Sequence, residues 1–385
     1  MRKIYLDHAA STPMHPEVAE AMISVMTEKF GNASSVHSFG REAKRMVNGA
    51  RDRLAASLGC RPEELVFTGG GTESDNLALF GTIQAQKSRG KHIVTTAIEH
   101  HAVLHSCRQL ERNGFEVTYL PVDRTGRVHP EQIAQSLRPD TILVSVMYGN
   151  NEVGTLQPIV EIGEMVRRNN SDTVFHVDAV QALGAVPIHC HELPADLISF
   201  SSHKINGPQG VGALYIRKKL MIEPMLYGGL QEKKRRAGTE NIAGIIGFAK
   251  AAELAAAGLS KRREHDLMLR TTLLKSLESA VGRGYFHVNG NEEYYLPHIL
   301  NISFPEMQTE TMLMNLDMEG IAVASGSACT SGSLEPSHVL EAMNLPQNLL
   351  RSAIRFSFGL GNTSEEIEYT AEKVGTILTR LRKKT

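Results

Sequence analysis

Short apolar segments alternate with helical patterns between residues 65 and 216, and this alternation limits the fold more than any other feature of the chain. The apolar segments have the length and composition of buried strands and lie at 65–68, 92–96, 117–120, 141–147, 174–179, 197–201 and 211–216. Helical patterns separate most of them, which favours parallel strands joined by crossover helices. Because the strands are apolar on both sides, helices should cover both faces of the sheet. The sequence therefore predicts an α/β fold with a mostly parallel, seven-stranded sheet.

The pattern changes after Gly228, where a basic, polar loop at 233–241 follows. Long helical segments and two further strands come next, at 242–257, 262–281, 300–303 and 354–357. These elements indicate a smaller α+β domain, which the first residues of the chain should rejoin. We therefore expect a large domain at 15–257 and a small domain formed by 1–14 and 258–385.

The length of 385 residues is too great for one typical domain and suits two. The 41 Lys and Arg residues balance 42 Asp and Glu residues, which gives no sign of direct nucleic-acid binding. No apolar run approaches the length of a membrane span, so we expect a soluble, cytoplasmic protein with no membrane partner. The cysteines show no metal-ligand spacing, and we expect neither disulfides nor a metal site; they are Cys60, Cys107, Cys190 and Cys329.

The segment at 197–204 is an apolar run that ends in Ser201, Ser202, His203 and Lys204, just before a Gly/Pro break. Open α/β sheets bind their ligands at the carboxyl ends of strands. A lysine desolvated at that edge has a lowered pKa and becomes a Schiff-base nucleophile. An isolated lysine at a strand end more often only extends into solvent, so the interpretation depends on its neighbours.

A glycine turn at 69–74 follows the strand at 65–68 and opens a helix. The exposed N–H groups and the helix dipole at such a junction bind phosphate readily, which makes Gly71 and Thr72 candidate phosphate-binding residues. A glycine turn alone is weak evidence, because it is often only a tight connection. The turn lacks the sequence forms of dinucleotide-binding and P-loop motifs.

Two further polar residues follow predicted strands, Asp178 and His100. Pyridoxal 5'-phosphate (PLP) chemistry requires a lysine, an acid for the pyridine nitrogen and a phosphate cradle. Asp178 can supply the acid, and His100 can stack on the ring and move protons. A capping aspartate or a structural histidine would explain either residue alone, whereas the combination with Lys204 favours a PLP site.

The motifs along the chain resemble those of cysteine desulfurases of the NifS/IscS type, within the class V aminotransferases of PLP fold type I. The resemblance covers nearly the whole chain and rests on LDHAA at 6–10, GGTESDN at 70–76, EH at 99–100, NNEVG at 150–154, HVDAVQ at 176–181, SSHK at 201–204, RAGTEN at 236–241, SGSAC at 325–329 and RFS at 355–357. Ser202 stands where some members carry glycine. The resemblance implies an aspartate-aminotransferase-like fold with a large PLP-binding domain and a small domain that carries a catalytic cysteine.

The resemblance also assigns roles to individual residues. It implies that Lys204 binds PLP covalently, that Asp178 pairs with the pyridine nitrogen and that Gln181 hydrogen-bonds the ring oxygen. The other cofactor-binding residues that it implies are Gly71, Thr72, His100, Asn151, Ser201, His203 and, from the second subunit of a homodimer, Thr239. Asn151 and Arg355 would bind the substrate, with Arg355 gripping its carboxylate.

Cys329 would be the nucleophile, on a loop of small residues that resembles the longer loop of the family's group I. The implied reaction removes sulfur from L-cysteine, leaves L-alanine and forms a persulfide on Cys329 that passes to an acceptor protein. An iron–sulfur scaffold, a tRNA thiolation enzyme and a thiamin-pathway carrier all fit the acceptor. Two rival interpretations stay open, namely another class V enzyme, such as a transaminase or selenocysteine lyase, and a non-enzymatic scaffold with a PLP fold.

Overall fold

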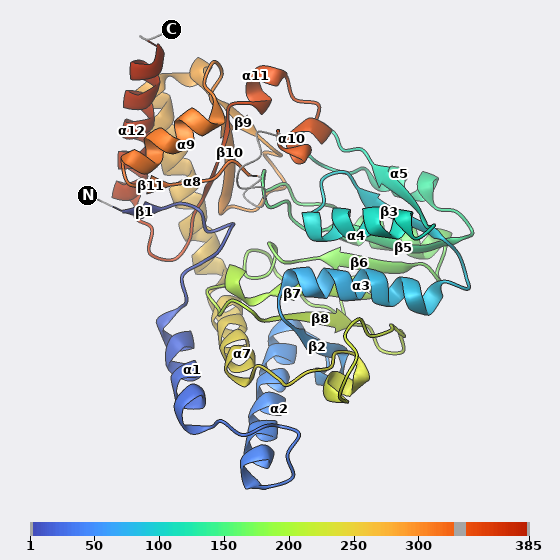
Figure 1. Ribbon diagram of the computed structural model, residues 1–385. Helices are drawn as coiled ribbons and strands as arrows, with labels where there is room; N and C mark the ends of the chain where they lie inside the picture. Colours follow the sequence, from blue (N-terminus) through green and yellow to red (C-terminus); the bar gives the residue numbers. More distant parts are fainter. Residues whose placement is uncertain (1–2, 327–335, 383–385) are drawn as a thin grey trace.

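The larger part of the molecule is built on a seven-stranded sheet (Figure 1), seen in a computed structural model that describes residues 3–326 and 336–382. The strand order is β2-β8-β7-β6-β5-β3-β4, and the strands are β2 (Leu65–Thr68), β3 (His92–Thr96), β4 (Glu116–Leu120), β5 (Thr141–Met147), β6 (Val174–Asp178), β7 (Leu197–Ser201) and β8 (Gly212–Ile216). Five of them, from β7 to β4, run parallel, and β8 pairs antiparallel with both β7 and β2. This confirms the predicted mostly parallel sheet.

Helices cover both faces of this sheet, as the apolar strands require. Side chains that alternate along a strand enter different cores, so that Val66 packs with α3 and α4 while Phe67 packs with the opposite layer. The helices of the larger part are α1 (Pro16–Glu28), α2 (Ser38–Leu58), α3 (Gly71–Gln86), α4 (His101–Arg112), α5 (Pro130–Ser136), α6 (Ile159–Asn169) and α7 (Ile242–Ala257). In Figure 1, α1, α2 and α7 lie together below the sheet, where α2 and α1 both pack on α7.

The smaller part lies at the upper left of Figure 1 and contains both chain termini. Its elements are β1 (Ile4–Tyr5), α8 (Leu259–Val281), β9 (His287–Asn289), β10 (Ile299–Ser303), α9 (Thr309–Met318), β11 (Ile321–Ala322), β12 (Ala353–Ser357) and α12 (Ser364–Arg382). The N-terminal β1 pairs in parallel with β11, and β10 lies between β12 and β9 in a second, antiparallel sheet. A separate hydrophobic core joins these elements. Two short helices, α10 (His338–Ala342) and α11 (Gln347–Leu350), contribute instead to the core of the larger part.

We propose that the two parts are two domains with the boundaries predicted from the sequence, 15–257 and 1–14 with 258–385. The separate core of the smaller part, which draws only on residues 4–6 and on residues from 269 onward, supports this division. No single helix in the described ranges is long and apolar enough to cross a membrane, although α7 and α8 taken together, across a bend of 73°, meet the length and composition limits.

Two glycines bring the start of α3 close to the strand ends. Gly70 precedes the helix with φ of 147°, a backbone conformation that residues with a side chain rarely adopt. At Gly212 in β8, a Cβ atom would lie 2.5 Å from the carbonyl oxygen of Phe200 and 2.8 Å from the backbone of Gly70. The close approach therefore requires glycine at 212, and it places the N-terminus of α3 beside β7 and β8.

We expect Leu273→Ala to lower the free energy of unfolding by about 2–5 kcal/mol, because Leu273 is fully buried in the core of the smaller domain and its loss leaves a cavity. Met314→Ala is the matched control, since Met314 is 68% exposed on α9 and should change stability by less than about 0.5 kcal/mol. Urea denaturation followed by circular dichroism measures both values. Equal effects of the two substitutions would contradict the assignment of the core.

Candidate active site

A cavity of about 330 Å³ lies at the carboxyl ends of β5, β6 and β7, between the two parts of the molecule. Most residues predicted for the cofactor and substrate line it: Gly71, Thr72, His100, Asn151, Asp178, Gln181, Ser201, His203, Lys204 and Arg355. They come from segments far apart in sequence, which parallel strands bring to one edge of the sheet. The structure thus gathers these residues in one place, although their individual roles remain predictions.

Lys204 ends a single 3₁₀ turn, η2 (Ser202–Lys204), that follows β7 directly. Its Nζ donates hydrogen bonds to the carbonyl oxygens of Ala9 and Ala10, the second at 2.9 Å. The Ala9 carbonyl also accepts a hydrogen bond of 2.9 Å from Gln181 Nε2. The N-terminal segment therefore forms one wall of the cavity. Sequence reasoning missed these two carbonyl groups, because the alanine side chains carry no chemical signal.

Asp178 is the last residue of β6 and is 5% exposed. One of its carboxyl oxygens accepts a 2.9 Å hydrogen bond from the backbone N–H of Val180. Burial raises the pKa of Asp178 to about 6, while the Val180 N–H and the positive charge of Lys204 act in the opposite direction. A positively charged ligand atom beside this carboxylate would further favour the ionised form.

The N-terminus of α3 provides a pocket that fits a phosphate group. The first N–H groups of a helix have no intrahelical acceptors and carry a partial positive charge. A Cβ atom on Gly71 would lie 2.7 Å from Val180 Cγ2 and 3.6 Å from Ser201 Cβ, so only glycine leaves this space open. The Ser201 hydroxyl oxygen is buried and has no hydrogen-bond partner within the described residues. A bound phosphate oxygen would satisfy it.

His100 is the N-cap of α4, and its Nδ1 accepts a hydrogen bond of 3.1 Å from the Ala102 N–H. Burial, followed by the nearby positive charge of Lys204, lowers the pKa of His100 to about 4. The ring is therefore neutral at pH 7, with its proton on Nε2 because Nδ1 is an acceptor. The same two causes lower the pKa of His203 to about 4.

Arg355 reaches the cavity from β12 in the smaller domain and is only 2% exposed. Its guanidinium group donates 2.8 Å hydrogen bonds to an Asp7 carboxylate oxygen and to the Asn151 carbonyl. Its Nε is buried and has no hydrogen-bond partner within the described residues. Asp7 is a residue of the site that sequence reasoning missed, although the resemblance already included it in the LDHAA stretch.

Two predicted site residues are not among those that line this cavity. Thr239 is exposed in the loop between η3 (Gln231–Lys234) and α7. Cys329 lies outside the described residues, and Gly326, three positions before it in the sequence, lines the cavity. Within 3–326 and 336–382, no group of three His, Cys, Asp or Glu side chains could hold a metal ion.

The comparisons with known proteins agree with this geometry. The family described as "Aminotransferase class-V" matches residues 4–370. The chain belongs to this family. A Bacillus subtilis (strain 168) relative called "Putative cysteine desulfurase IscS 1" is 51% identical over 382 residues, covering 99% of this chain and 100% of the relative. A Dictyoglomus turgidum relative called "Cysteine desulfurase IscS" is 48% identical over 99% of this chain and 96% of its own length.

Solved structures are similar to this protein over almost its whole length. A structure described as "NIFS-LIKE PROTEIN" superposes with a TM-score of 0.93 at 39% identity, covering 98% of this chain and 100% of the other. One described as "SspA in complex with cysteine" superposes with a TM-score of 0.81 at 32% identity, covering 92% and 99%. These similarities confirm the predicted PLP fold type I architecture.

The cofactor of this class V aminotransferase is PLP, and the cavity fits it. Asp178 lies where a buried carboxylate can hold the pyridine nitrogen protonated, and the Gly71 space with the unsatisfied Ser201 hydroxyl suits the phosphate. A larger cavity of about 480 Å³ also includes Lys204, but it lacks Asp178, His100 and the start of α3. The smaller cavity therefore fits the cofactor better than the larger one.

We expect Lys204→Ala to abolish covalent attachment of PLP, because Lys204 is the lysine in the cofactor cavity. Wild type reconstituted with PLP and treated with borohydride should retain the cofactor through denaturation, as measured by mass spectrometry. The variant should release it. Lys261→Ala is the matched control, since Lys261 is exposed and lines only the neighbouring cavity. Cofactor retained by the Lys204 variant would contradict the assignment.

Proposed function

We propose that this protein is a PLP-dependent cysteine desulfurase, which transfers the sulfur of L-cysteine to Cys329 and releases L-alanine. The single observation that carries the proposal is the cavity that joins Lys204 and Asp178, as PLP chemistry requires, to a buried arginine from the other domain. Relatives of matching length that carry the name cysteine desulfurase support it, as does a related structure described as a complex with cysteine.

Each side chain of the cavity has a definite task in this reaction. Arg355 and Asn151 bind the substrate, and the guanidinium group meets the cysteine carboxylate with two parallel hydrogen bonds. His100 is neutral and Nδ1 is occupied by the Ala102 N–H, so Nε2 is the atom that can exchange a proton with the substrate. Lys204 provides the amine that binds PLP and is regenerated at each turnover. When bound, PLP supplies an electron sink for the carbanion formed at the substrate α-carbon.

The side chain of this protein that first takes the sulfur from the substrate must be a thiol. Three of the four cysteines are unsuitable for this role. Cys107 and Cys190 are buried, burial raises the pKa of Cys107 to about 12, and the neighbouring Cys60 raises the pKa of Cys190. Cys107, Cys190 and Cys60 are all absent from the lining of the cavity. Cys329 remains, and it follows the cavity-lining Gly326 by only three residues in the sequence.

The sulfur step balances without an external oxidant. The Cys329 thiolate attacks the substrate sulfur, an S–S bond forms, the C–S bond breaks and its electron pair stays on the substrate carbon. Protonation of that carbon gives alanine and leaves a persulfide on Cys329. A thiol of an acceptor protein then attacks the outer sulfur and restores the Cys329 thiol.

We propose an iron–sulfur scaffold protein or a tRNA thiolation enzyme as the sulfur acceptor, as the sequence resemblance implied. The relatives named IscS support the first more directly than the second. Persulfide transfer needs reduced thiols, and the described cysteines Cys60, Cys107 and Cys190 are free, which fits the cytoplasm as the place of action.

We expect Cys329→Ser to bind PLP normally but to form alanine from cysteine more than about 100-fold slower than wild type, because an alcohol cannot accept sulfur. Wild type incubated with cysteine and alkylated without reductant should carry one additional sulfur on Cys329 by mass spectrometry. Cys60→Ser is the matched control and should behave as wild type. Near-normal turnover by Cys329→Ser would favour a transaminase or a selenocysteine lyase.

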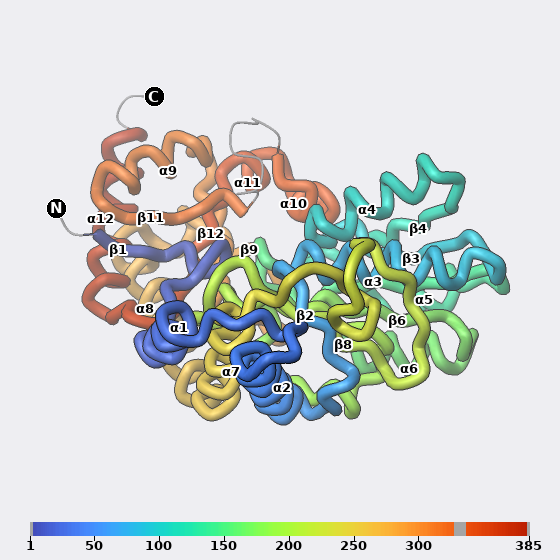
Figure 2. The backbone as a smooth tube through the Cα atoms, turned by 60° about the horizontal axis from the view of Figure 1, so that its bottom comes forward, coloured from blue at the N-terminus to red at the C-terminus, as the bar shows by residue number. Residues whose placement is uncertain are grey.

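We also propose a homodimer in which Thr239 completes the partner's phosphate site. Thr239 is exposed, and large apolar side chains of the α1–α2 connection and of the loop before α7 are exposed as well: Phe30, Val36, Tyr227 and Leu230. Figure 2 shows the α1–α2 connection and the loop before α7 on the same side of the molecule, where Ser34 and Leu230 line one groove. Such a patch is typical of a protein interface.

Mixed dimers test this arrangement. A heterodimer of one Lys204→Ala subunit and one Thr239→Ala subunit contains one site with both wild-type residues if Thr239 acts across the interface. We expect it to recover about half of wild-type activity, while the Thr239→Ala homodimer binds PLP more weakly. If the heterodimer is no more active than a mixture of the two homodimers, Thr239 does not act on the partner's site.

A further inference from the structure

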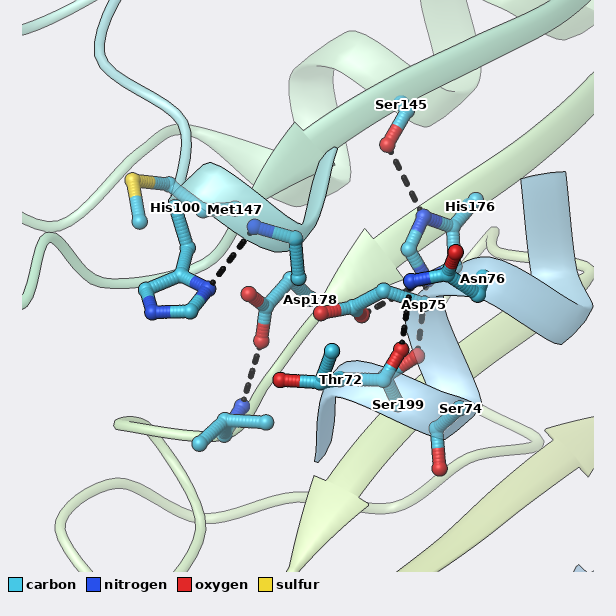
Figure 3. A network of polar contacts seen from close by, with 12 residues as sticks. Thr72, Ser74, Asp75, Asn76, His100, Ser145, Met147, His176, Asp178 and Ser199 are labelled. Atoms are coloured by element: carbon cyan, nitrogen blue, oxygen red, sulfur yellow. Dashed lines mark hydrogen bonds and ion pairs between the residues drawn. The ribbon is translucent and has the colours of Figure 1, made fainter. Parts of the chain in front are cut away.

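A second buried carboxyl group, that of Asp75, belongs to the cofactor cavity and has no role in the reaction described above. Asp75 lies near the N-terminus of α3, lines the cavity together with Asp178 and is 1% exposed. In Figure 3 its carboxyl group lies between the carboxyl group of Asp178 and the ring of His176. Two buried acids at one site require an account of where the negative charge resides.

Uncharged groups form the inner side of this site. The His176 ring is fully buried, with Nδ1 2.8 Å from the Ser145 hydroxyl and Nε2 2.9 Å from the Ser199 hydroxyl. Nε2 is also 3.6 Å from Asp75 Oδ1. Burial lowers the pKa of His176 to about 3, so the ring is neutral and provides no positive charge to Asp75. Asp75 Oδ1 is buried and has no hydrogen-bond partner within the described residues.

The charged groups that face Asp75 from other elements all disfavour its ionisation or act on Asp178 instead. Burial raises the pKa of Asp75 well above its ordinary value, and Asp178 and Glu99 raise it further, while the Ser199 hydroxyl acts in the opposite direction. Asp178, in contrast, has the Val180 N–H and the positive charge of Lys204 to stabilise its ionised form. The two carboxyl groups are therefore not equivalent.

We propose that Asp75 keeps its proton in the holoenzyme and acts as a positioning residue, so that Asp178 alone carries the negative charge beneath the cofactor. The inference rests on the proposed PLP-dependent function. A neutral Asp75 fills the space behind Asp178 with a polar group that adds no second charge. The pyridine nitrogen of bound PLP would then pair with one carboxylate only, that of Asp178. Ionisation of Asp75 would add a second negative charge to the site. That charge would make a bound pyridine nitrogen hold its proton more tightly.

Infrared spectroscopy of the PLP-loaded protein tests this directly. Aspartate-labelled protein, with ¹³C in the carboxyl groups, separates the carbonyl band of protonated aspartic acids from that of buried glutamic acids such as Glu99. At about pH 8.5, above the pKa of about 6 for Asp178 and of about 7 for Asp266, we expect one protonated aspartic acid band. Asp75→Asn should remove it, and the matched control Asp266→Asn should leave it unchanged.

The pH dependence of stability gives a second, cofactor-independent measurement. An aspartic acid whose pKa is raised by folding binds its proton more tightly in the native state than in the unfolded state. Its contribution to the free energy of unfolding is therefore present at low pH and is lost as pH rises above about 4, the pKa in the unfolded chain. Relative to Asp75→Asn, the unfolding equilibrium constant of wild type should therefore rise about tenfold per pH unit until Asp75 ionises.

These results can fail independently of the desulfurase assignment, because neither uses cysteine turnover. An absent aspartic acid band in wild type, a band that survives Asp75→Asn, or parallel stability profiles would each overturn the proposal. If Asp75→Asn does not fold, Asp178→Asn serves instead, since loss of the Asp178 charge should move the disappearance of the Asp75 band to lower pH. A band that disappears at unchanged pH in that variant would also overturn it.

Discussion

The ion pair between the buried Arg355 and the half-buried Asp7 connects the three parts of the molecule that make the site. Asp7 follows β1, whose strand pairing joins the N-terminus to the smaller domain, and Arg355 comes from β12 of that domain. Asn151, the second acceptor of the guanidinium group, belongs to the larger domain. Removal of one partner from a buried pair costs about 3–5 kcal/mol, because the other charge loses its compensation. The pair therefore fixes the N-terminal segment where Ala9 and Ala10 can receive Lys204.

Burial is also the largest single influence on the acids and bases of the cavity, and it favours the uncharged form of each. It lowers the pKa of His100 and His203 to about 4 and raises that of Asp178 to about 6. The histidines thus remain neutral in the native state as pH falls from 7 toward 4. Because the unfolded chain binds protons from about pH 6.5 downward, the stability that depends on their neutral form is lost progressively across that interval. A group that must be charged, such as Asp178, needs a specific partner to overcome the same desolvation.

The sequence was sufficient for those parts of the site that depend on local pattern. Lys204 and Asp178 come at the ends of apolar runs, and parallel strands must bring such ends together. The backbone carbonyls of Ala9 and Ala10 could not be predicted, because they depend on how a distant segment crosses the sheet. Nothing in the pattern of the basic, polar loop at 233–241 indicates that the adjacent Glu232 is nearly buried and pairs with Arg51 at 2.5 Å. Thr239 could be placed only by resemblance, since its proposed site belongs to another subunit.

The position of Asp75 shows how competing electrostatic effects are decided by their size. Asp75 is the fifth residue of α3 and lies just beyond its first turn, where the helix dipole stabilises an acid by about 0.3–1 kcal/mol, and by up to about 2 kcal/mol when partly buried. Burial and the negative charge of Asp178 both oppose ionisation of Asp75, and burial is the larger of the two effects. Desolvation, together with repulsion from Asp178, therefore outweighs the dipole and raises the pKa of Asp75 well above its ordinary value, as the proposed protonated state requires. A phosphate group at the same helix N-terminus would add further negative charge, so cofactor binding strengthens the preference. In the proposed holoenzyme, the N-terminus of α3 would then be available to the phosphate, and the carboxylate of Asp178 to the pyridine nitrogen.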